Sequence, residues 1–228
     1  GKERLRVLLT NGKFQGTNDL HGEGAAQAGF ALAPLLHTGN RDRALVIGYG
    51  TGMSARVLHD AGFRELEIVD LSADIVRLAN EHFRSINAGV TARPGVSTYI
   101  TDGRNFLMLQ NRHYDVVSME LTSIWFAGAA SLYNREFYQL VKRRLAPQGV
   151  LQQWVQLHHI RSQDILFILG SVRAEFRYVW LYEIGGQGII IASNSPAADP
   201  QAVYLEKLER TEALESLFKL SGGSMKQL

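Results

Sequence analysis

The stretch Ala44-Leu-Val-Ile-Gly-Tyr-Gly-Thr-Gly-Met53 decides the fold of this chain. Its apolar start is typical of a buried strand and ends in three alternating glycines, Gly48, Gly50 and Gly52, before a helix-prone segment at 54–59. Glycine lets the backbone bend sharply close to a ligand, and the free N–H groups at the start of a helix point to the same place. The stretch therefore predicts a strand, a glycine loop and a helix that bind a ligand together.

A second apolar run ends in an acid, Asp70, twenty residues beyond Gly50. An acid at this distance is placed to hydrogen-bond the hydroxyl groups of a ribose. The combination of strand, glycines, helix and acid favours ligand binding over a tight turn without a ligand. The Gly-x-Gly-x-Gly spacing differs from the Gly-x-Gly-x-x-Gly of nicotinamide dinucleotide sites. We therefore expect an adenosine-containing ligand of the S-adenosylmethionine type.

Composition limits the class of protein. The chain has 228 residues, 46% of them hydrophobic, which is enough for one well-buried α/β domain. A formal charge of +2 is too small to indicate nucleic acid as a partner. The sequence has no cysteine, which excludes disulfides, thiolate metal sites and cysteine nucleophiles, and no spacing typical of a metal site occurs, so we expect no metal. The absence of cysteine fits a reducing compartment, and the longest mostly apolar stretch, Ala25 to Leu36, is too short to span a bilayer, so we expect a cytoplasmic location.

Alternation of strand and helix patterns predicts the architecture. Apolar strand candidates lie at 44–48, 65–70, 96–100, 114–119 and 149–155, with helical patterns between most of them. Two final candidates, 178–183 and 188–192, are separated by Gly185-Gly186 and predict a hairpin. This order predicts a doubly wound, mostly parallel seven-stranded sheet with an antiparallel last strand, the class I methyltransferase-like Rossmann fold.

Smaller signals complete the outline. Asn11-Gly12 between two short apolar runs predicts a β-hairpin, so we divide the chain into a hairpin at 1–20 and a ligand-binding domain at 21–228. A helix of small residues is expected from about Gly24 to His37. Side chains expected to cap the starts of later helices are those of Ser72, Asn134 and Ser162.

Ligands of such sheets lie beyond the carboxyl ends of the strands, so the residues there are the candidate site. After the third strand of the sheet, Asp102 is placed to accept from an adenine amino group, and Gly103 leaves room for the ring; the alternative for Asp102 is to cap a helix starting near Arg104. After the fourth, Glu120 is placed to take a proton from an attacking amine, and its alternative is an exposed loop glutamate. The aromatic, glycine-rich loop 121–133 fits a lid over an active site, although core packing explains some of its rings.

The chain resembles the polyamine aminopropyltransferases, the spermidine synthase family, over nearly its whole length. The segments that carry the resemblance are Leu9 to Gln15, Val46 to Gly52, Asp70, Thr101 to Gly103, Tyr114 to Glu120, and Leu132 to Tyr138. The resemblance implies transfer of an aminopropyl group from decarboxylated S-adenosylmethionine, or use of S-adenosylmethionine itself, with a small-molecule amine as acceptor in polyamine biosynthesis.

Roles follow from the same resemblance. It implies that Asp70 binds ribose hydroxyls, that Asp102 binds adenine, and that Gln15 contacts the adenosyl ligand. Glu120 stands where the family has its catalytic aspartate. The candidates for the substrate side are Trp125, Tyr133 and Glu23.

The segment from Trp125 to Leu157 looks most like a bacterial branch whose members often carry this domain behind membrane-spanning helices. The resemblance therefore implies a membrane tether in a longer parent chain, consistent with a sequence that starts at Gly1 without methionine. Family members also often form homodimers.

Three departures from the family keep other functions open. Thr51 and Ser123 stand where the family has acids, and Ala26-Gln27-Ala28 stands where it has Tyr-His-Glu. The alternatives are a small-molecule methyltransferase on the same fold and an adenosyl-ligand-binding domain without catalysis. A dehydrogenase is a more distant alternative.

Overall fold

The computed structural model describes residues 4–10, 12–19, 23–120, 129–157, 160–184 and 186–196, apart from the side chains at 23–26, 129 and 184. Its strands are β1 (Val7–Thr10), β2 (Lys13–Thr17), β3 (Arg43–Ile47), β4 (Glu65–Asp70), β5 (Val96–Ile100), β6 (Tyr114–Met119), β7 (Leu145–Val155), β8 (Tyr178–Ile184) and β9 (Gln187–Ser193). Its α-helices are α1 (Glu23–Leu32), α2 (Met53–Asp60), α3 (Ala73–His82), α4 (Arg84–Asn87), α5 (Gly103–Leu109), α6 (Arg135–Arg144) and α7 (Ser162–Arg173). Short 3₁₀ turns are η1 (Ala33–Leu36), η2 (Val90–Ala92) and η3 (Ala129–Leu132).

Seven strands form one sheet in the order β5-β4-β3-β6-β7-β9-β8. The strands from β5 to β7 pair in parallel, and β9 runs antiparallel to both of its neighbours. The predicted doubly wound sheet with an antiparallel last strand is confirmed. The strand order reverses between the neighbouring strands β3 and β6, because β4 and β5 lie on one side of β3 and all later strands of the sheet lie on the other. Ligands of such sheets bind beyond the carboxyl ends of the strands at this point.

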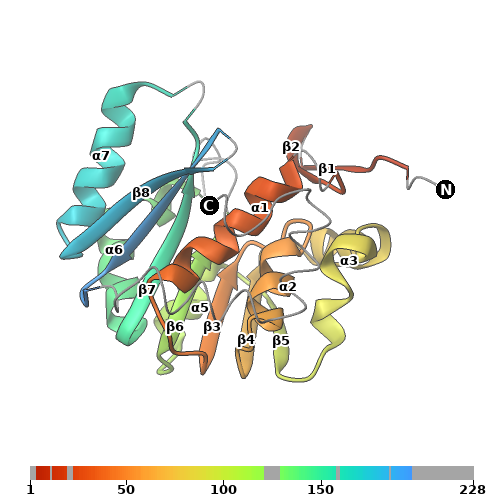
Figure 1. The fold of residues 1–228 in the computed structure, drawn as a ribbon, viewed down its shortest axis with the longest axis horizontal. Helices are drawn as coiled ribbons and strands as arrows, with labels where there is room; N and C mark the ends of the chain where they lie inside the picture. The colour runs from red at the N-terminus through yellow and green to blue at the C-terminus, as the bar shows by residue number, and fades with distance from the viewer. Residues whose placement is uncertain are drawn as a thin grey trace.

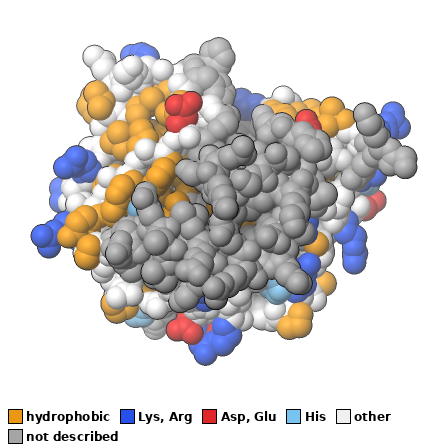
Figure 2. Space-filling view, viewed as in Figure 1, with side chains coloured by type: hydrophobic (Ala, Val, Ile, Leu, Met, Phe, Trp, Pro, Cys, Tyr) orange, Lys and Arg blue, Asp and Glu red, His pale blue; other side chains and the backbone are white. Residues whose placement is uncertain are grey.

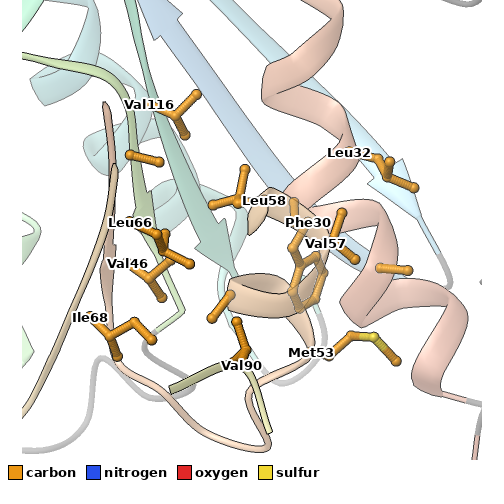
Figure 3. Packing of buried hydrophobic residues seen from close by; sticks show 14 of the residues in the cluster. Phe30, Leu32, Val46, Met53, Val57, Leu58, Leu66, Ile68, Val90 and Val116 are labelled. Atoms are coloured by element: carbon orange, nitrogen blue, oxygen red, sulfur yellow. The ribbon is translucent and has the colours of Figure 1, made fainter. Parts of the chain in front are cut away.

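Helices cover both faces of the sheet (Figure 1). Side chains alternate along β3, so that Ala44 and Val46 pack in the cluster under α1 and α2, whereas Leu45 and Ile47 pack in the cluster under α5, α6 and α7. Figure 3 shows the first cluster, in which Phe30 of α1 lies among side chains of the sheet and of α2. Two buried apolar layers therefore hold the central parallel strands, whose carboxyl ends lie together at one edge of the sheet.

The predicted N-terminal hairpin is confirmed as the pair β1–β2, with Gly12 at φ 75° in its turn. It packs against the sheet domain through Gly16, where an added Cβ would lie 2.7 Å from both Gln27 Nε2 and Thr51 Cγ2. The guanidinium of Arg6 also donates to the carbonyl of His82 at 2.6 Å. The hairpin thus lies directly beside α1 and the glycine loop.

Helix boundaries test the predicted caps. Ser72 and Asn134 cap α3 and α6 as predicted, each accepting a backbone N–H bond in the first turn. The prediction for Ser162 is wrong: it is the first residue of α7, and Arg161 is the cap. The Arg161 carbonyl accepts from the N–H of Asp164 at 2.9 Å and its guanidinium binds the Asp164 carboxylate at 2.9 Å, but no side chain caps the first turn of α7.

Other boundaries differ from the predictions. The helix expected up to His37 ends as an α-helix at Leu32 and continues as η1, because Pro34 has no N–H to donate. The fifth strand of the sheet begins at Leu145, earlier than predicted, directly after α6. In the part of the chain that is described, no helix is both long enough and apolar enough to cross a bilayer.

Hydrophobic side chains also reach the surface on one side of the molecule. Leu166 and Phe167 of α7 and Leu181 of the edge strand β8 are exposed. Figure 2 shows hydrophobic side chains gathered on this side of the face seen in Figure 1.

Candidate active site

The glycine loop joins β3 to α2 in the predicted conformation. All three glycines have positive φ, 91° at Gly48, 52° at Gly50 and 84° at Gly52. A Cβ on Gly52 would lie 2.6 Å from the ring of Tyr49, whereas a Cβ on Gly50 would meet nothing within 4 Å. Gly52 is therefore required by close packing inside the loop, and Gly50 lies on its open side, where a ligand can approach the backbone.

Asp70, at the end of β4, is bonded to this loop. Its Oδ2 accepts from the N–H of Tyr49 and its Oδ1 from the N–H of Ser72, both at 2.8 Å. Burial raises the pKa of the carboxyl, and the two backbone bonds oppose that shift. The acid expected to bind ribose hydroxyls therefore also fixes the loop that borders the same space.

Buried polar groups support the loop from inside. Asn87 is fully buried, and its Nδ2 donates to the carbonyls of Thr51 at 3.1 Å and Ala79 at 2.9 Å. On the other side, the hydroxyl of Thr51 donates to Gln27 Oε1 on α1 at 2.9 Å. Two of the three departures from the family thus touch each other in a neutral hydrogen bond. The loop is held in place before any ligand arrives.

Asp102 caps α5, accepting from the N–H of Asn105 through Oδ1 at 2.8 Å. The capping alternative is therefore correct for one carboxylate oxygen. Gly103 is needed for a different reason from the one predicted. A Cβ there would lie 2.4 Å from Ile47 Cγ2, so glycine is needed for α5 to approach β3. Adenine binding by either residue stays a prediction.

Glu120 directly follows β6, beside the point where the strand order of the sheet reverses. Its N–H donates to the carbonyl of Ile47 at 3.0 Å, which places it beside the start of the glycine loop. Ser118 Oγ lies 2.8 Å from Glu120 Oε1. Burial raises the pKa of the carboxyl to about 7, against the opposing effect of the hydroxyls of Ser118 and Ser54. Glu120 is partly buried, so the alternative of an exposed loop glutamate is wrong.

Asp70, the open side of the glycine loop at Gly50 and the carboxyl of Glu120, whose pKa burial raises, thus lie at one end of the sheet, an arrangement that suits an adenosyl ligand. The sequence profile of the spermine/spermidine synthase domain matches residues 26–195. The chain belongs to the spermine/spermidine synthase family. The match confirms the resemblance to the spermidine synthase family that was seen in the sequence.

Curated relatives in the family are named polyamine aminopropyltransferases. The chain is 29% identical over 202 residues to the one from Nitrosomonas europaea, covering 84% of this chain and 61% of that protein. It is 31% identical over 201 residues to polyamine aminopropyltransferase 2 from Pseudomonas aeruginosa, covering 83% of this chain and 56% of that protein. The chain therefore spans less than two thirds of the length of either relative.

Solved structures share the fold. A spermidine synthase in complex with the transition-state analogue AdoDATO matches with a TM-score of 0.75 at 20% identity, covering 95% of this chain and 80% of that one. Human methyltransferase-like protein 13 in complex with SAH matches with a TM-score of 0.61 at 22% identity, covering 87% of this chain and 91% of that one. At such identities the likeness shows the shared fold.

Of the other predicted site residues, Gln15 and Tyr133 are described by the structure. Gln15 is half-buried on β2, next to Gly16, which packs against the glycine loop. Tyr133 lies at the same edge as Glu120, with its hydroxyl donating to the carbonyl of Trp154 at the end of β7 at 3.2 Å. Burial raises its pKa. Trp125 and the side chain of Glu23 lie outside the described residues.

Ser118 and Gln152 are site residues that the sequence reading missed. Both are fully buried in neighbouring strands of the sheet, β6 and β7. Each is a polar residue inside a mostly apolar strand. Because a buried polar group needs a hydrogen-bond partner, this pattern in the sequence could have indicated that the two side chains form a polar contact. In the described ranges, no three histidine, aspartate or glutamate side chains come together in a way that could hold a metal ion.

Proposed function

We propose that this chain transfers an aminopropyl group from decarboxylated S-adenosylmethionine to a small amine, with Glu120 as the base. The observation that carries the proposal is the position of Glu120, next to the glycine loop, with a pKa of about 7. A general base works best when its pKa lies near the working pH. Family membership and the AdoDATO complex of a structural neighbour support the choice of donor.

The chemistry needs few groups. The nitrogen lone pair of the amine attacks the CH₂ bound to the sulfonium, a C–N bond forms, and the C–S bond breaks with its electron pair going to sulfur. The leaving group is the neutral thioether methylthioadenosine. An alkyl ammonium ion has a pKa near 10, so the amine must lose a proton before its lone pair can attack, and Glu120 accepts that proton. Rate enhancement then comes from positioning the two reactants and from this base.

Each site residue has a proposed role in holding the donor. Asp70 accepts from the ribose hydroxyls, and the backbone around Gly50 borders the adenosyl group. Asp102 uses one oxygen for its helix cap and offers the other to the adenine amino group. We assign Gln15 to the adenosyl group and Tyr133 to the acceptor side, and we keep Trp125 and Glu23 as candidates there.

The test is a product assay by mass spectrometry. Purified protein is incubated with decarboxylated S-adenosylmethionine or with S-adenosylmethionine, each with a mixture of diamines and polyamines. We expect methylthioadenosine and a lengthened amine from the decarboxylated donor, both lost in Glu120→Gln. The matched control is Glu183→Gln, because Glu183 is an exposed glutamate on the edge strand β8.

Two other outcomes would identify the alternatives. S-adenosylhomocysteine and a methylated acceptor would make the chain a methyltransferase, consistent with the fold it shares with methyltransferase-like protein 13. Protection from thermal unfolding by both donors, with neither consumed, would indicate an adenosyl-ligand-binding domain without catalysis.

A further inference from the structure

Ser118 and Gln152 form a buried polar pair beneath Glu120. They are paired in register across the parallel strands β6 and β7, and neither is exposed to solvent. Ser118 lies two residues before Glu120, so their side chains leave the backbone on the same face of the sheet. The neighbours of the pair along both strands, Val116 and Val150, are apolar core residues. Two polar side chains at matched positions in this core therefore need a reason.

The number of protons between these groups is informative. Ser118 Oγ lies 2.8 Å from Glu120 Oε1 and 2.5 Å from Gln152 Oε1. A hydroxyl has one proton to donate, so it cannot serve both oxygens at once. At the same time Gln152 Nε2, which carries two protons, is buried and has no partner in this orientation. One of the three groups must supply a further proton.

Two arrangements satisfy the distances. In the first, Glu120 is protonated and donates to Ser118, and Ser118 donates to Gln152 Oε1. In the second, the Gln152 amide is reversed, so that Nε2 donates to Ser118 and Ser118 donates to the ionised carboxylate. The oxygen and nitrogen of a side-chain amide are assigned by their hydrogen bonds, and both assignments occupy the same space. The two arrangements differ by one proton on Glu120.

We propose that Ser118 and Gln152 are positioning residues that orient the Glu120 carboxylate and stabilise its ionised form through one continuous chain of hydrogen bonds. The inference rests on the proposed role of Glu120 as the base. Gln152 donates to Ser118, and Ser118 donates to Glu120 Oε1, the oxygen that the chain fixes. We assign the proton of the amine to the other oxygen, Oε2.

The described groups that favour the ionised form of Glu120 are neutral hydroxyls. Ser54, at the start of α2, is the other hydroxyl that favours the ionised form of Glu120, and it lies 3.3 Å from the carbonyl of Gln27 on α1. Among the described residues, no charged side chain contributes to the pKa shift of Glu120, which burial dominates. No cation of the described part of the chain therefore compensates for the loss of a hydrogen bond from Ser118, and the ionised form loses more than the protonated form because bonds to charged groups are stronger.

The experiment titrates Glu120 directly by infrared spectroscopy. The carbonyl band of its protonated carboxyl is assigned by its absence in Glu120→Gln and followed against pH. In Ser118→Ala we expect the midpoint to rise by about one pH unit, the order of one hydrogen bond to a charged group. In Gln152→Met, which keeps the volume and removes the donor to Ser118, we expect a smaller rise in the same direction.

The matched control is Ser193→Ala. Ser193 is a buried serine of β9 whose hydroxyl donates to the carbonyl of Gly149 at 3.0 Å, away from Glu120, and its loss should leave the midpoint unchanged. A wild-type midpoint in both Ser118→Ala and Gln152→Met would overturn the inference. The acid limb of the kcat/KM profile, which reports the free enzyme, should shift with the infrared midpoint. If no turnover occurs at all, the proposed function fails while the titration still tests the hydrogen-bond chain.

Discussion

Asp70 Oδ2 accepts a hydrogen bond from the backbone N–H of Tyr49 at 2.8 Å, so the acid at the end of β4 holds the glycine loop at the end of β3. The same carboxylate binds the N–H of Ser72 through its other oxygen. If Asp70 binds the ribose as proposed, ligand binding and the shape of the loop are coupled, and a substitution of Asp70 acts on both together.

We expect Asp70→Asn to weaken binding of S-adenosylhomocysteine or methylthioadenosine by about 10- to 100-fold, the order of one or two lost charge-assisted hydrogen bonds. Asparagine keeps one acceptor oxygen, but its NH₂ group faces the second backbone N–H, so we expect a loss of stability of about 1–3 kcal/mol. Calorimetric titration measures the affinity and urea unfolding the stability. A matched control is Asp74→Asn, because Asp74 is exposed in the first turn of α3, outside the strand end. Unchanged affinity in Asp70→Asn would contradict the ribose role.

Much of the fold could be predicted from local patterns. The parallel strands β4, β5 and β6 begin and end at the predicted residues, because each is a short apolar run between clear breakers. The start of α7 could not be, since serine favours the cap position but here lies one residue inside a helix that begins without a side-chain cap. Local patterns predict strand positions well, whereas the first residue of a helix can differ by one from the best capping residue.

Parts of the site could be predicted where the residue type or its place at a strand end points to a single structural explanation. The positive φ of Gly50 follows from the glycine motif, and the position of Glu120 follows from the end of its strand. Contacts across the sheet were not predictable. The reason for Gly103 is Ile47, on a strand distant in sequence, and Ser118 meets Gln152 only once the parallel register is known.

Removal of the base should abolish turnover while leaving donor binding intact. We expect Glu120→Gln to lower kcat by about 10²- to 10⁴-fold, the usual contribution of a general base. The affinity for methylthioadenosine should change little, because the adenosyl group is assigned to Asp70 and the glycine loop. Single-turnover kinetics and calorimetric titration make the comparison, with Glu183→Gln as the control. Equal losses of binding and turnover would instead indicate a role of Glu120 in holding the donor.

The activity of the wild-type protein should depend on the ionisation of Glu120. Its pKa is raised to about 7, and the base form is the ionised carboxylate. We therefore expect log kcat/KM, which reports the pKa of the free enzyme, to rise with a slope of one as pH increases toward about 7 and to level off above it. A profile of kcat/KM for the decarboxylated donor against pH measures this limb. An acid limb near pH 4.5, the ordinary value for glutamate, would show that burial does not control this carboxyl.

The same shift has a consequence for stability. Between pH 4.5 and about 7 the folded protein keeps a proton on Glu120 that the unfolded chain has lost, so the free energy of unfolding falls as pH rises through this window. Above it, the folded protein carries a charge on this partly buried carboxyl, which Glu120→Gln removes. We expect Glu120→Gln to be more stable than wild type by about 3 kcal/mol at pH 8 and nearly equal to it at pH 4.5. Urea unfolding at both pH values tests this, and an equal gain at both would point to packing rather than charge.

The open side of the glycine loop gives the last prediction. Gly50 and Gly62 both have positive φ, 52° and 90°, and at both an added Cβ would meet nothing within 4 Å. Alanine at either position should therefore cost a similar amount of stability, about 1–2 kcal/mol for a left-handed conformation. Only Gly50 borders the proposed adenosyl site, since Gly62 lies in the turn between α2 and β4. We expect Gly50→Ala to lose at least about tenfold in affinity for methylthioadenosine because its methyl group occupies ligand space, whereas Gly62→Ala binds like wild type. Equal affinities in the two variants would mean that the ligand does not approach the backbone at Gly50.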